Sequence, residues 1–238
     1  VMRLPRFGGD AAGTVGGEAG LASVAAYGFS PAISAESPYR GGYLAVVEAV
    51  CRAVAAGADP RRLRLSLQEY FPRPGSEPER WGLPVAALLG ALSAQLDLET
   101  PAIGGKDSMS GTFEDLDVPP TLIAFAFGPG REKQVRSPEL KAEGSRLVLL
   151  RPGAEGEKPA SADPSRAHST GPPATTPAPA DTHGQTSTGL PRAEALREIL
   201  NFLHEAAEDE GLLSVAAVGE DGLAGTLARA IFGNHVGV

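Results

Sequence analysis

The segment from Gly104 to Ser108 combines side chains that could bind a phosphate group or a metal ion. Gly104 and Gly105 allow the main chain to approach a ligand closely. Lys106 supplies a positive charge, Asp107 a carboxylate that could bind a metal, and Ser108 a hydroxyl group. The spacing is not that of a P-loop, in which the lysine directly precedes Ser or Thr. Two interpretations stay open, a phosphate-binding segment and a glycine-rich surface turn.

A single carboxylate, Glu48, stands out in a helical segment that is apolar on nearly every face. At helical spacing it shares a face with Leu44, Cys51 and Ala55, where a carboxylate is unfavourable without a neutralising partner. One interpretation is an i,i+4 ion pair with Arg52, which would contribute roughly 0.2–0.5 kcal/mol. The other is a ligand of Mg²⁺, which completes its shell with water and phosphate oxygens. Spacing alone favours the ion pair.

Arg40 lies at the start of the same helical segment, three residues after Ser37. The free N–H groups of a helix N-terminus bind anions, and the charge of Arg40 would reinforce such binding. Ser37 could equally be a turn residue. Arg40 is therefore a further candidate for phosphate binding.

The overall composition excludes several classes of protein. The net charge of −8 argues against a protein that binds nucleic acid by neutralising its phosphates. No apolar run reaches the roughly 18 residues that cross a bilayer, and no signal peptide opens the chain. We therefore expect a cytoplasmic protein with no membrane partner. The only cysteine, Cys51, excludes an internal disulfide, and its apolar helix favours a core residue over a nucleophile.

The apolar periodicity predicts the elements that must position these residues. Helices are expected at 41–56, at 85–96 with Pro84 in its first turn, at 192–209 and at 222–232. Strands are expected at 63–67, 121–127 and 146–150, whereas residues 1–41 show little periodicity. Because helices and strands alternate, the predicted fold class is mixed α/β, or α+β.

The composition changes sharply between Arg151 and Arg192. This segment is rich in Pro, Ala, Thr, Ser and Gly and has no sustained apolar run, so we expect it to be disordered or a long excursion. The predicted organisation is a first domain at 1–141 and a second at 142–238. Both chain ends look like cuts through a longer protein, so we expect a fragment.

Taken together, the motifs resemble one family of enzymes. In chain order they are SPYRGGYLAVVEAV at 37–50, QEYF at 68–71, PERWG at 78–82, PAIGGKDSMSGTF at 101–113 and DVPPTL at 117–122. This series resembles the second synthetase half of formylglycinamidine ribonucleotide synthase. The resemblance is dense from about residue 26 to 127 and resumes more loosely from about residue 190. The Gly-Lys-Asp-Ser-Met run is its most specific part.

The resemblance implies a fold and a reaction. The fold would be an aminoimidazole-ribonucleotide-synthetase-like first domain followed by the start of its second domain. The family transfers ammonia, which a glutaminase domain releases from glutamine, to formylglycinamide ribonucleotide in purine synthesis, and ATP activates the substrate carbonyl. ATP or ADP and Mg²⁺ would be the cofactors, and the other synthetase half and the glutaminase would be the partners. This chain contains nothing that resembles the glutaminase site.

The resemblance also assigns residues, and some of them depart from the family pattern. Glu48 matches a magnesium-binding carboxylate, but Arg52 stands where many members have Asn. In the second domain, Ala217 aligns with a metal-binding Asp and Gly219 with a nucleotide-contacting Ser. These departures leave two alternatives: a non-catalytic scaffold half with a degenerate nucleotide site, and a related ATP-using synthetase or kinase of the same superfamily. The segment from Gly104 to Ser108 argues against the related enzymes, which carry other signatures there.

Overall fold

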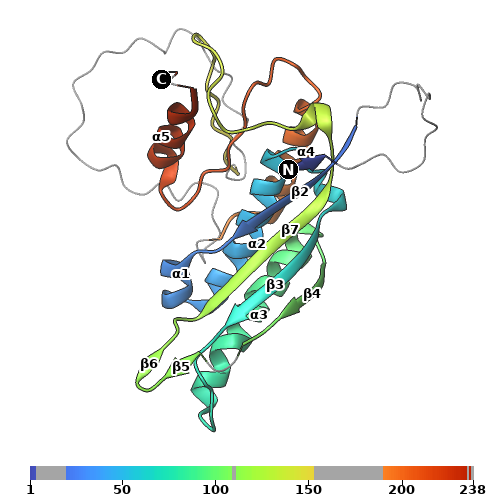
Figure 1. The fold of residues 1–238 in the computed structure, drawn as a ribbon. Coiled ribbons are helices and arrows are strands. Elements are labelled where there is room, and N and C mark those ends of the chain that lie inside the picture. Colours follow the sequence, from blue (N-terminus) through green and yellow to red (C-terminus); the bar gives the residue numbers. More distant parts are fainter. Residues whose placement is uncertain (4–19, 109–110, 153–189, 235, 237–238) are drawn as a thin grey trace.

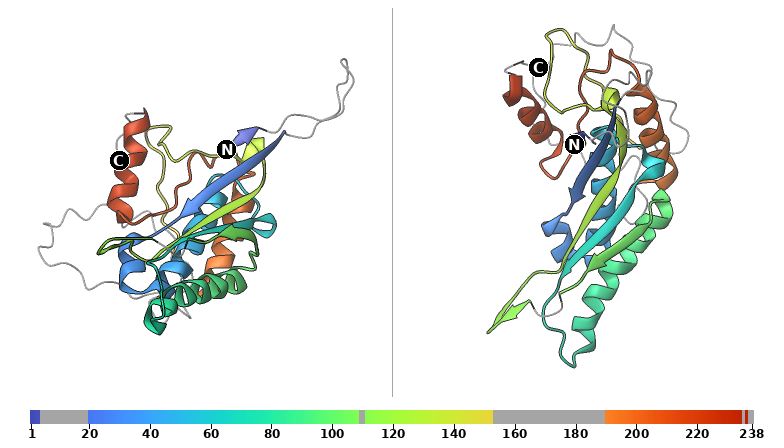
Figure 2. Two further views of the ribbon diagram at one scale, coloured as in Figure 1. Left: turned by 60° about the horizontal axis from the view of Figure 1, so that its bottom comes forward. Right: turned by 45° about the vertical axis from the view of Figure 1, so that its right-hand side comes forward.

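A five-stranded sheet with helices packed on one face forms the centre of the molecule (Figures 1 and 2). The computed structural model describes residues 1–3, 20–108, 111–152, 190–234 and 236. Its strands are β1 (Met2–Arg3), β2 (Leu21–Gly28), β3 (Arg64–Tyr70), β4 (Ala102–Lys106), β5 (Thr112–Phe113), β6 (Leu116–Asp117) and β7 (Thr121–Arg131). Its α-helices are α1 (Pro31–Glu36), α2 (Pro38–Ala55), α3 (Pro78–Leu98), α4 (Ala193–Ala206) and α5 (Gly222–Asn234), with 3-10 turns at Pro60–Arg62 and Glu132–Gln134.

The strand β7 lies at the middle of this sheet, whose order is β1-β2-β7-β3-β4. It pairs antiparallel with β2 on one side and with β3 on the other. The outer pair of β3 and β4 is parallel, and β5 and β6 form a separate two-stranded ribbon. The predicted α+β class is confirmed.

The helix α2 lies between the sheet and α3. Its small residues Ala45, Ala49 and Ala53 are fully buried, so the helix can approach the sheet closely. Two glycines set the α2–α3 contact, because a Cβ at Gly42 would lie 2.2 Å from the Ala87 carbonyl oxygen and one at Gly90 only 1.9 Å from that of Tyr39. The main chains of the two helices therefore touch.

The predicted helices at 41–56 and 85–96 are confirmed, but both begin earlier than expected. Ser37 caps α2 by accepting a hydrogen bond from the Arg40 N–H at 3.4 Å, as helix N-caps commonly do. Pro78 occupies the first turn of α3, and Pro84 lies inside that helix instead of opening it. The two helix starts are therefore marked by Ser37-Pro38 and by Pro78.

Three sequence expectations are corrected by the structure. Residues 146–150 form no strand but an irregular segment whose apolar side chains are exposed. The strand β2 was not predicted, because its alternating residues are mostly Ala, Ser and Gly and give a weak periodicity. By length and composition α3 could cross a membrane, although no such run was expected. One face of α3 packs on α2, and a core helix can have the same length and apolar composition.

The predicted helices at 192–209 and 222–232 are also confirmed, as α4 and α5. Leu196 and Leu200 of α4 join the same hydrophobic core as α2, α3 and the sheet. The predicted disorder at 151–192 falls almost wholly outside the described residues. The domain boundary at 142 stays a prediction.

Candidate functional site

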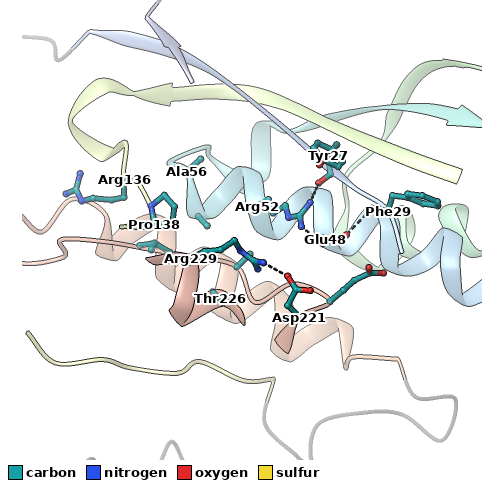
Figure 3. A pocket seen from close by; sticks show the side chains of 15 residues that line it. Tyr27, Phe29, Glu48, Arg52, Ala56, Arg136, Pro138, Asp221, Thr226 and Arg229 are labelled. Atoms are coloured by element: carbon teal, nitrogen blue, oxygen red, sulfur yellow. Dashed lines mark hydrogen bonds and ion pairs between the residues drawn. The ribbon is translucent and has the colours of Figure 1, made fainter. Parts of the chain in front are cut away.

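A cavity of about 510 Å³ lies between the Glu48 face of α2 and the chain around α5 (Figure 3). Residues from two distant parts of the sequence line it. Tyr27, Phe29, Glu48, Arg52, Ala55 and Ala56 belong to the first part, and Arg136, Pro138, Val215, Ala216, Ala217, Glu220, Asp221, Thr226 and Arg229 to the second. Ligand pockets commonly range from about 300 to 1,000 Å³, so this cavity has the volume for a nucleotide-sized ligand.

Both carboxylate oxygens of Glu48 have partners. Oε1 lies 2.6 Å from Nη2 of Arg52, one helical turn further along α2. Oε2 accepts a hydrogen bond of 2.9 Å from the N–H of Phe29, which follows β2. The side chain of Glu48 is only 15% exposed, and a carboxylate at this depth needs such neutralisation. The ion pair with Arg52 was one of the two interpretations from the sequence.

Arg52 is held at a second point, on β2. Its Nη1 donates a hydrogen bond of 3.0 Å to the carbonyl oxygen of Tyr27, and its guanidinium group lies 5.3 Å from the centre of the Tyr27 ring. A cation over an aromatic face gains further attraction. Arg52 therefore links α2 to the end of β2 while it neutralises Glu48 (Figure 3).

The loop before α5 closes the other side of the cavity. Ala217 lines it, and the α-carbon of Gly219 faces three charged groups. A Cβ at Gly219 would lie 3.5 Å from Arg52 Nη2, 3.8 Å from Arg229 Nη2 and 3.8 Å from Glu48 Oε1. Arg229 in turn forms an ion pair with Asp221 at the start of α5. The segments that carry Glu48 and Gly219 thus meet in one place.

The residues of this cavity do not fit a magnesium ion. The two Glu48 oxygens already bind Arg52 and the Phe29 N–H, and the methyl group of Ala217 cannot coordinate a cation. Within the described part of the chain, no group of three or more His, Cys, Asp and Glu residues could hold a metal. The chemistry that this donor set offers is hydrogen bonding by guanidinium groups.

Cys51 follows Glu48 by three residues and is no nucleophile. Burial, with a smaller contribution from the Glu48 charge, raises the pKa of its thiol to about 12. A cysteine reacts as the thiolate, and at neutral pH this thiol stays protonated. This agrees with the expectation of a core residue.

The Gly104–Ser108 segment lies elsewhere, at the end of the edge strand β4. A Cβ at Gly105 would lie 2.6 Å from the Leu67 carbonyl oxygen. The packing of β4 against β3 is therefore a second explanation for a glycine at this position. The Lys106 ammonium donates a hydrogen bond of 2.5 Å to Ser108 Oγ and lies 5.9 Å from the centre of the Tyr70 ring. None of residues 104–108 lines the cavity around Glu48. The structure therefore does not bring these two groups of candidates together.

Arg40 also lies apart from the cavity, in the first turn of α2. Its Nε is buried and has no hydrogen-bond partner within the described residues. A buried guanidinium nitrogen without a partner is unfavourable. The Nε–H group of Arg40 therefore remains available as a donor near the start of α2.

Glu69 is a carboxylate that the sequence analysis missed. It is 5% exposed, and its Oε2 has no hydrogen-bond partner among the described residues. Burial, reinforced by the charge of Asp107, raises the pKa of Glu69 from 4.5 to about 7. Alternate residues of a strand point to the same face, so Glu69 lies on the inner face of β3 together with Leu65. This alternation is the sequence pattern from which the burial of Glu69 could have been predicted.

Comparison with known proteins yields structural likeness only. No family model and no curated protein matches the chain. Phosphoribosylformylglycinamidine synthase II from Thermotoga maritima matches at 22% identity and a TM-score of 0.42, over 52% of this chain and 20% of that one. PurLQS from the same organism matches at 23% and 0.40, over 51% and 20%. Thiamine monophosphate kinase from Aquifex aeolicus matches at 18% and 0.32, over 54% and 37%.

Each of these proteins is longer than the segment of it that matches this chain. The chain spans about one fifth of the two Thermotoga proteins. Other structures of T. maritima PurL contain ATP, ADP or FGAR.

Proposed function

We propose that this chain is part of the ATP-dependent ligase that converts formylglycinamide ribonucleotide and glutamine to formylglycinamidine ribonucleotide. The ordered series of motifs from residue 37 to 122 supports the proposal. One structural observation carries it further. Glu48 and Ala217, which the family pattern assigns to a single metal and nucleotide site, line the same cavity although they lie far apart in the sequence.

In this proposal the cavity around Glu48 receives the phosphates of ATP or ADP. Phosphate would also bind away from this cavity, to Lys106, Ser108 and Arg40. Lys106 and Asp107 are exposed, which leaves them accessible to a ligand or to a partner domain. The other synthetase half and a glutaminase domain that supplies ammonia would complete the cytoplasmic enzyme.

A second candidate function is a scaffold half whose nucleotide site is degenerate. Two observations favour it: the ion pair that uses Glu48 Oε1 and the methyl group of Ala217 in place of a carboxylate. In this case the chain would support the other half without taking part in the chemistry. The two candidates differ in whether ATP is hydrolysed here.

Ligase activity of the intact enzyme tests both candidates. If residues 104–108 bind the reacting phosphate, Lys106→Ala in the full-length protein lowers ATP-dependent product formation by about 100-fold or more, as loss of a transition-state cation does. Arg61→Ala is the matched control, because Arg61 is an exposed cation away from both sites. A change of less than threefold in Lys106→Ala supports the scaffold function.

The isolated chain gives a simpler check. We expect no product with either glutamine or ammonia, since no glutaminase site and only part of a synthetase are present. ATP-dependent product from the purified chain alone contradicts this expectation.

A further inference from the structure

The guanidinium group of Arg52 lies where a divalent cation would bind the Glu48 carboxylate. Its Nη2 is 2.6 Å from Oε1, whereas Mg²⁺ sits about 2.0–2.1 Å from its oxygen ligands. A divalent cation at this oxygen would lie against the positively charged guanidinium, and the other oxygen already accepts a hydrogen bond from the Phe29 N–H at 2.9 Å. A metal at Glu48 would therefore compete with Arg52 for the carboxylate.

Arg52 has further contacts that hold it beside Glu48. Besides Glu48 it binds the Tyr27 carbonyl oxygen at 3.0 Å and stacks against the Tyr27 ring. Charge-assisted hydrogen bonds such as these are stronger than neutral ones. Moving the guanidinium away would break these contacts and leave Glu48 without a cation.

A second guanidinium points to the same place. The Nη2 atoms of Arg52 and Arg229 both lie within 3.8 Å of the Cβ position of Gly219, on the side of the loop that faces the cavity. Arg136 also lines the cavity, but its guanidinium already donates five hydrogen bonds to main-chain carbonyls such as that of Leu212. The N–H donors that remain available to a phosphate group are therefore those of Arg52 and Arg229.

Asp221, the nearest other carboxylate of the cavity to α5, is paired with Arg229. Within the described residues, the acidic side chains of the cavity do not form a group that could hold a metal. Three carboxylates and three guanidinium groups line the cavity, so recognition would depend on the direction of the N–H groups and not on an excess of charge.

We propose that Arg52 replaces the divalent cation of this cavity, so that Glu48 holds no metal and the phosphates of a ligand bind directly to the guanidinium groups of Arg52 and Arg229. The metal part of this proposal depends only on the contacts of Glu48. The phosphate part rests on the proposed nucleotide function. The cavity would then bind a nucleoside diphosphate in the absence of magnesium.

Mn²⁺ binding tests the metal part without any nucleotide. In an electron paramagnetic resonance titration we expect no Mn²⁺ site at Glu48 in the wild-type chain. The double variant Arg52→Asn with Ala217→Asp provides two free carboxylates and should bind Mn²⁺, and adding Glu48→Gln should abolish that binding. Arg52→Lys, which keeps the positive charge, is the matched control and should bind none. Circular dichroism shows whether each variant is folded.

The outcome that overturns this part is specific. If the wild-type chain binds one Mn²⁺ and Glu48→Gln removes it, Arg52 does not replace the cation. This result would leave the proposed ligase function intact.

Calorimetry with ADP tests the phosphate part. We expect the same Kd in EDTA and in excess Mg²⁺, and a Kd raised about tenfold or more by Arg52→Gln or Arg229→Gln, since each removes a charged donor. Arg61→Gln serves as the control and should leave the Kd unchanged. ADP binding that requires Mg²⁺ overturns the inference but supports the proposed function. Absence of ADP binding in both buffers overturns the phosphate part and counts against a nucleotide site, whatever the Mn²⁺ result.

Discussion

Two carboxylates of the described part of the chain, the partly buried Glu48 and the buried Glu69, have opposite environments. Glu48 has a partner for each oxygen, whereas Glu69 has an Oε2 without a partner in the described part and a neighbouring negative charge, that of Asp107. A buried carboxylate without a cation holds its proton to a higher pH. Glu69 therefore titrates near neutral pH.

We predict that Glu69 makes the free energy of unfolding depend on pH. Between pH 4.5 and about 7 the unfolded carboxyl loses its proton while the folded one keeps it, so stability decreases as the pH rises through this window and levels off above it. The pKa change sets an upper limit of roughly 3 kcal/mol, and solvent screening reduces it to about 1–2 kcal/mol. Glu69→Gln should remove this dependence and stabilise the chain at pH 8.

Urea denaturation at pH 5 and pH 8 measures the effect. Glu79→Gln, at an exposed position in α3, is the control and should keep the wild-type pH dependence. A Glu69→Gln variant that loses as much stability as the wild type between the two pH values contradicts the prediction.

The sequence could reveal some of the candidate site and not the rest. Glu48 could be recognised because an acidic residue interrupts an apolar helix, and its partner Arg52 follows from helical spacing. The proximity of Gly219 could not be derived from periodicity, because it depends on how the loop before α5 returns to α2. Only the family pattern linked these two positions. Glu69 was missed because the strand was expected only at 63–67, whereas β3 extends to Tyr70.

At the scale of the elements, the contact between α2 and α3 depends on the absence of a side chain. A Cβ at Gly90 would lie 1.9 Å from the carbonyl oxygen of Tyr39, and a main-chain atom cannot turn away as a side chain can. We predict that Gly90→Ala destabilises the fold by about 2 kcal/mol or more, because overpacking outweighs the gain in helix propensity.

The same helix contains a matched control for this change. Gly82 has nothing within 4 Å of its Cβ position, so Gly82→Ala should stabilise the chain by roughly 0.5–1 kcal/mol. Thermal melts of the two variants give the sign of each effect. If both substitutions raise the Tm, the close packing of α2 on α3 does not exist in solution.

The helix α4 tests whether the C-terminal part belongs to the common core. Leu200 is 3% exposed and packs in the same hydrophobic cluster as α2 and α3. We predict that Leu200→Ala lowers the free energy of unfolding by about 2–4 kcal/mol, measured by urea denaturation. Phe202→Ala, at a position 57% exposed on the same helix, should change it by less than about 1 kcal/mol. Equal effects would show that α4 does not dock there.

The elements with strong periodicity were predictable and those with weak periodicity were not. The helix α2 has apolar residues on every turn, so the helix could be recognised even though its predicted start was a few residues late. The apolar run at 146–150 satisfied the composition of a strand, but no strand of the described chain pairs with it. Pairing depends on a partner distant in the sequence, which a local pattern does not contain.

At the scale of the whole molecule, the sheet has one covered face and one open face. Leu122, Ala124 and Ala126 of β7 face the helices and are buried, so the alternate residues lie on the other face. There the rings of Phe125 and Phe127 stack, with centroids 6.4 Å apart. Exposed apolar faces of this kind mediate association.

We predict that the isolated chain associates with itself through this face. Light scattering should show an apparent mass that rises with concentration, and Phe127→Lys should weaken the rise, because a charge on the face opposes its burial. Phe232→Lys, at an exposed position on α5, is the control and should not change it. A monomer at all concentrations contradicts the prediction.

The central position of β7 has a consequence for synthesis on the ribosome. The strand β2 ends at Gly28 and β3 at Tyr70, but the strand that joins them begins only at Thr121. At about 5–20 residues per second, the ribosome needs roughly 5–20 s to pass from the end of β2 to the start of β7. During this time β2 lacks its main ladder partner and α2 lacks part of the surface that buries it. The nascent chain therefore exposes apolar segments until β7 has been synthesised. We expect chaperones to bind it during this interval.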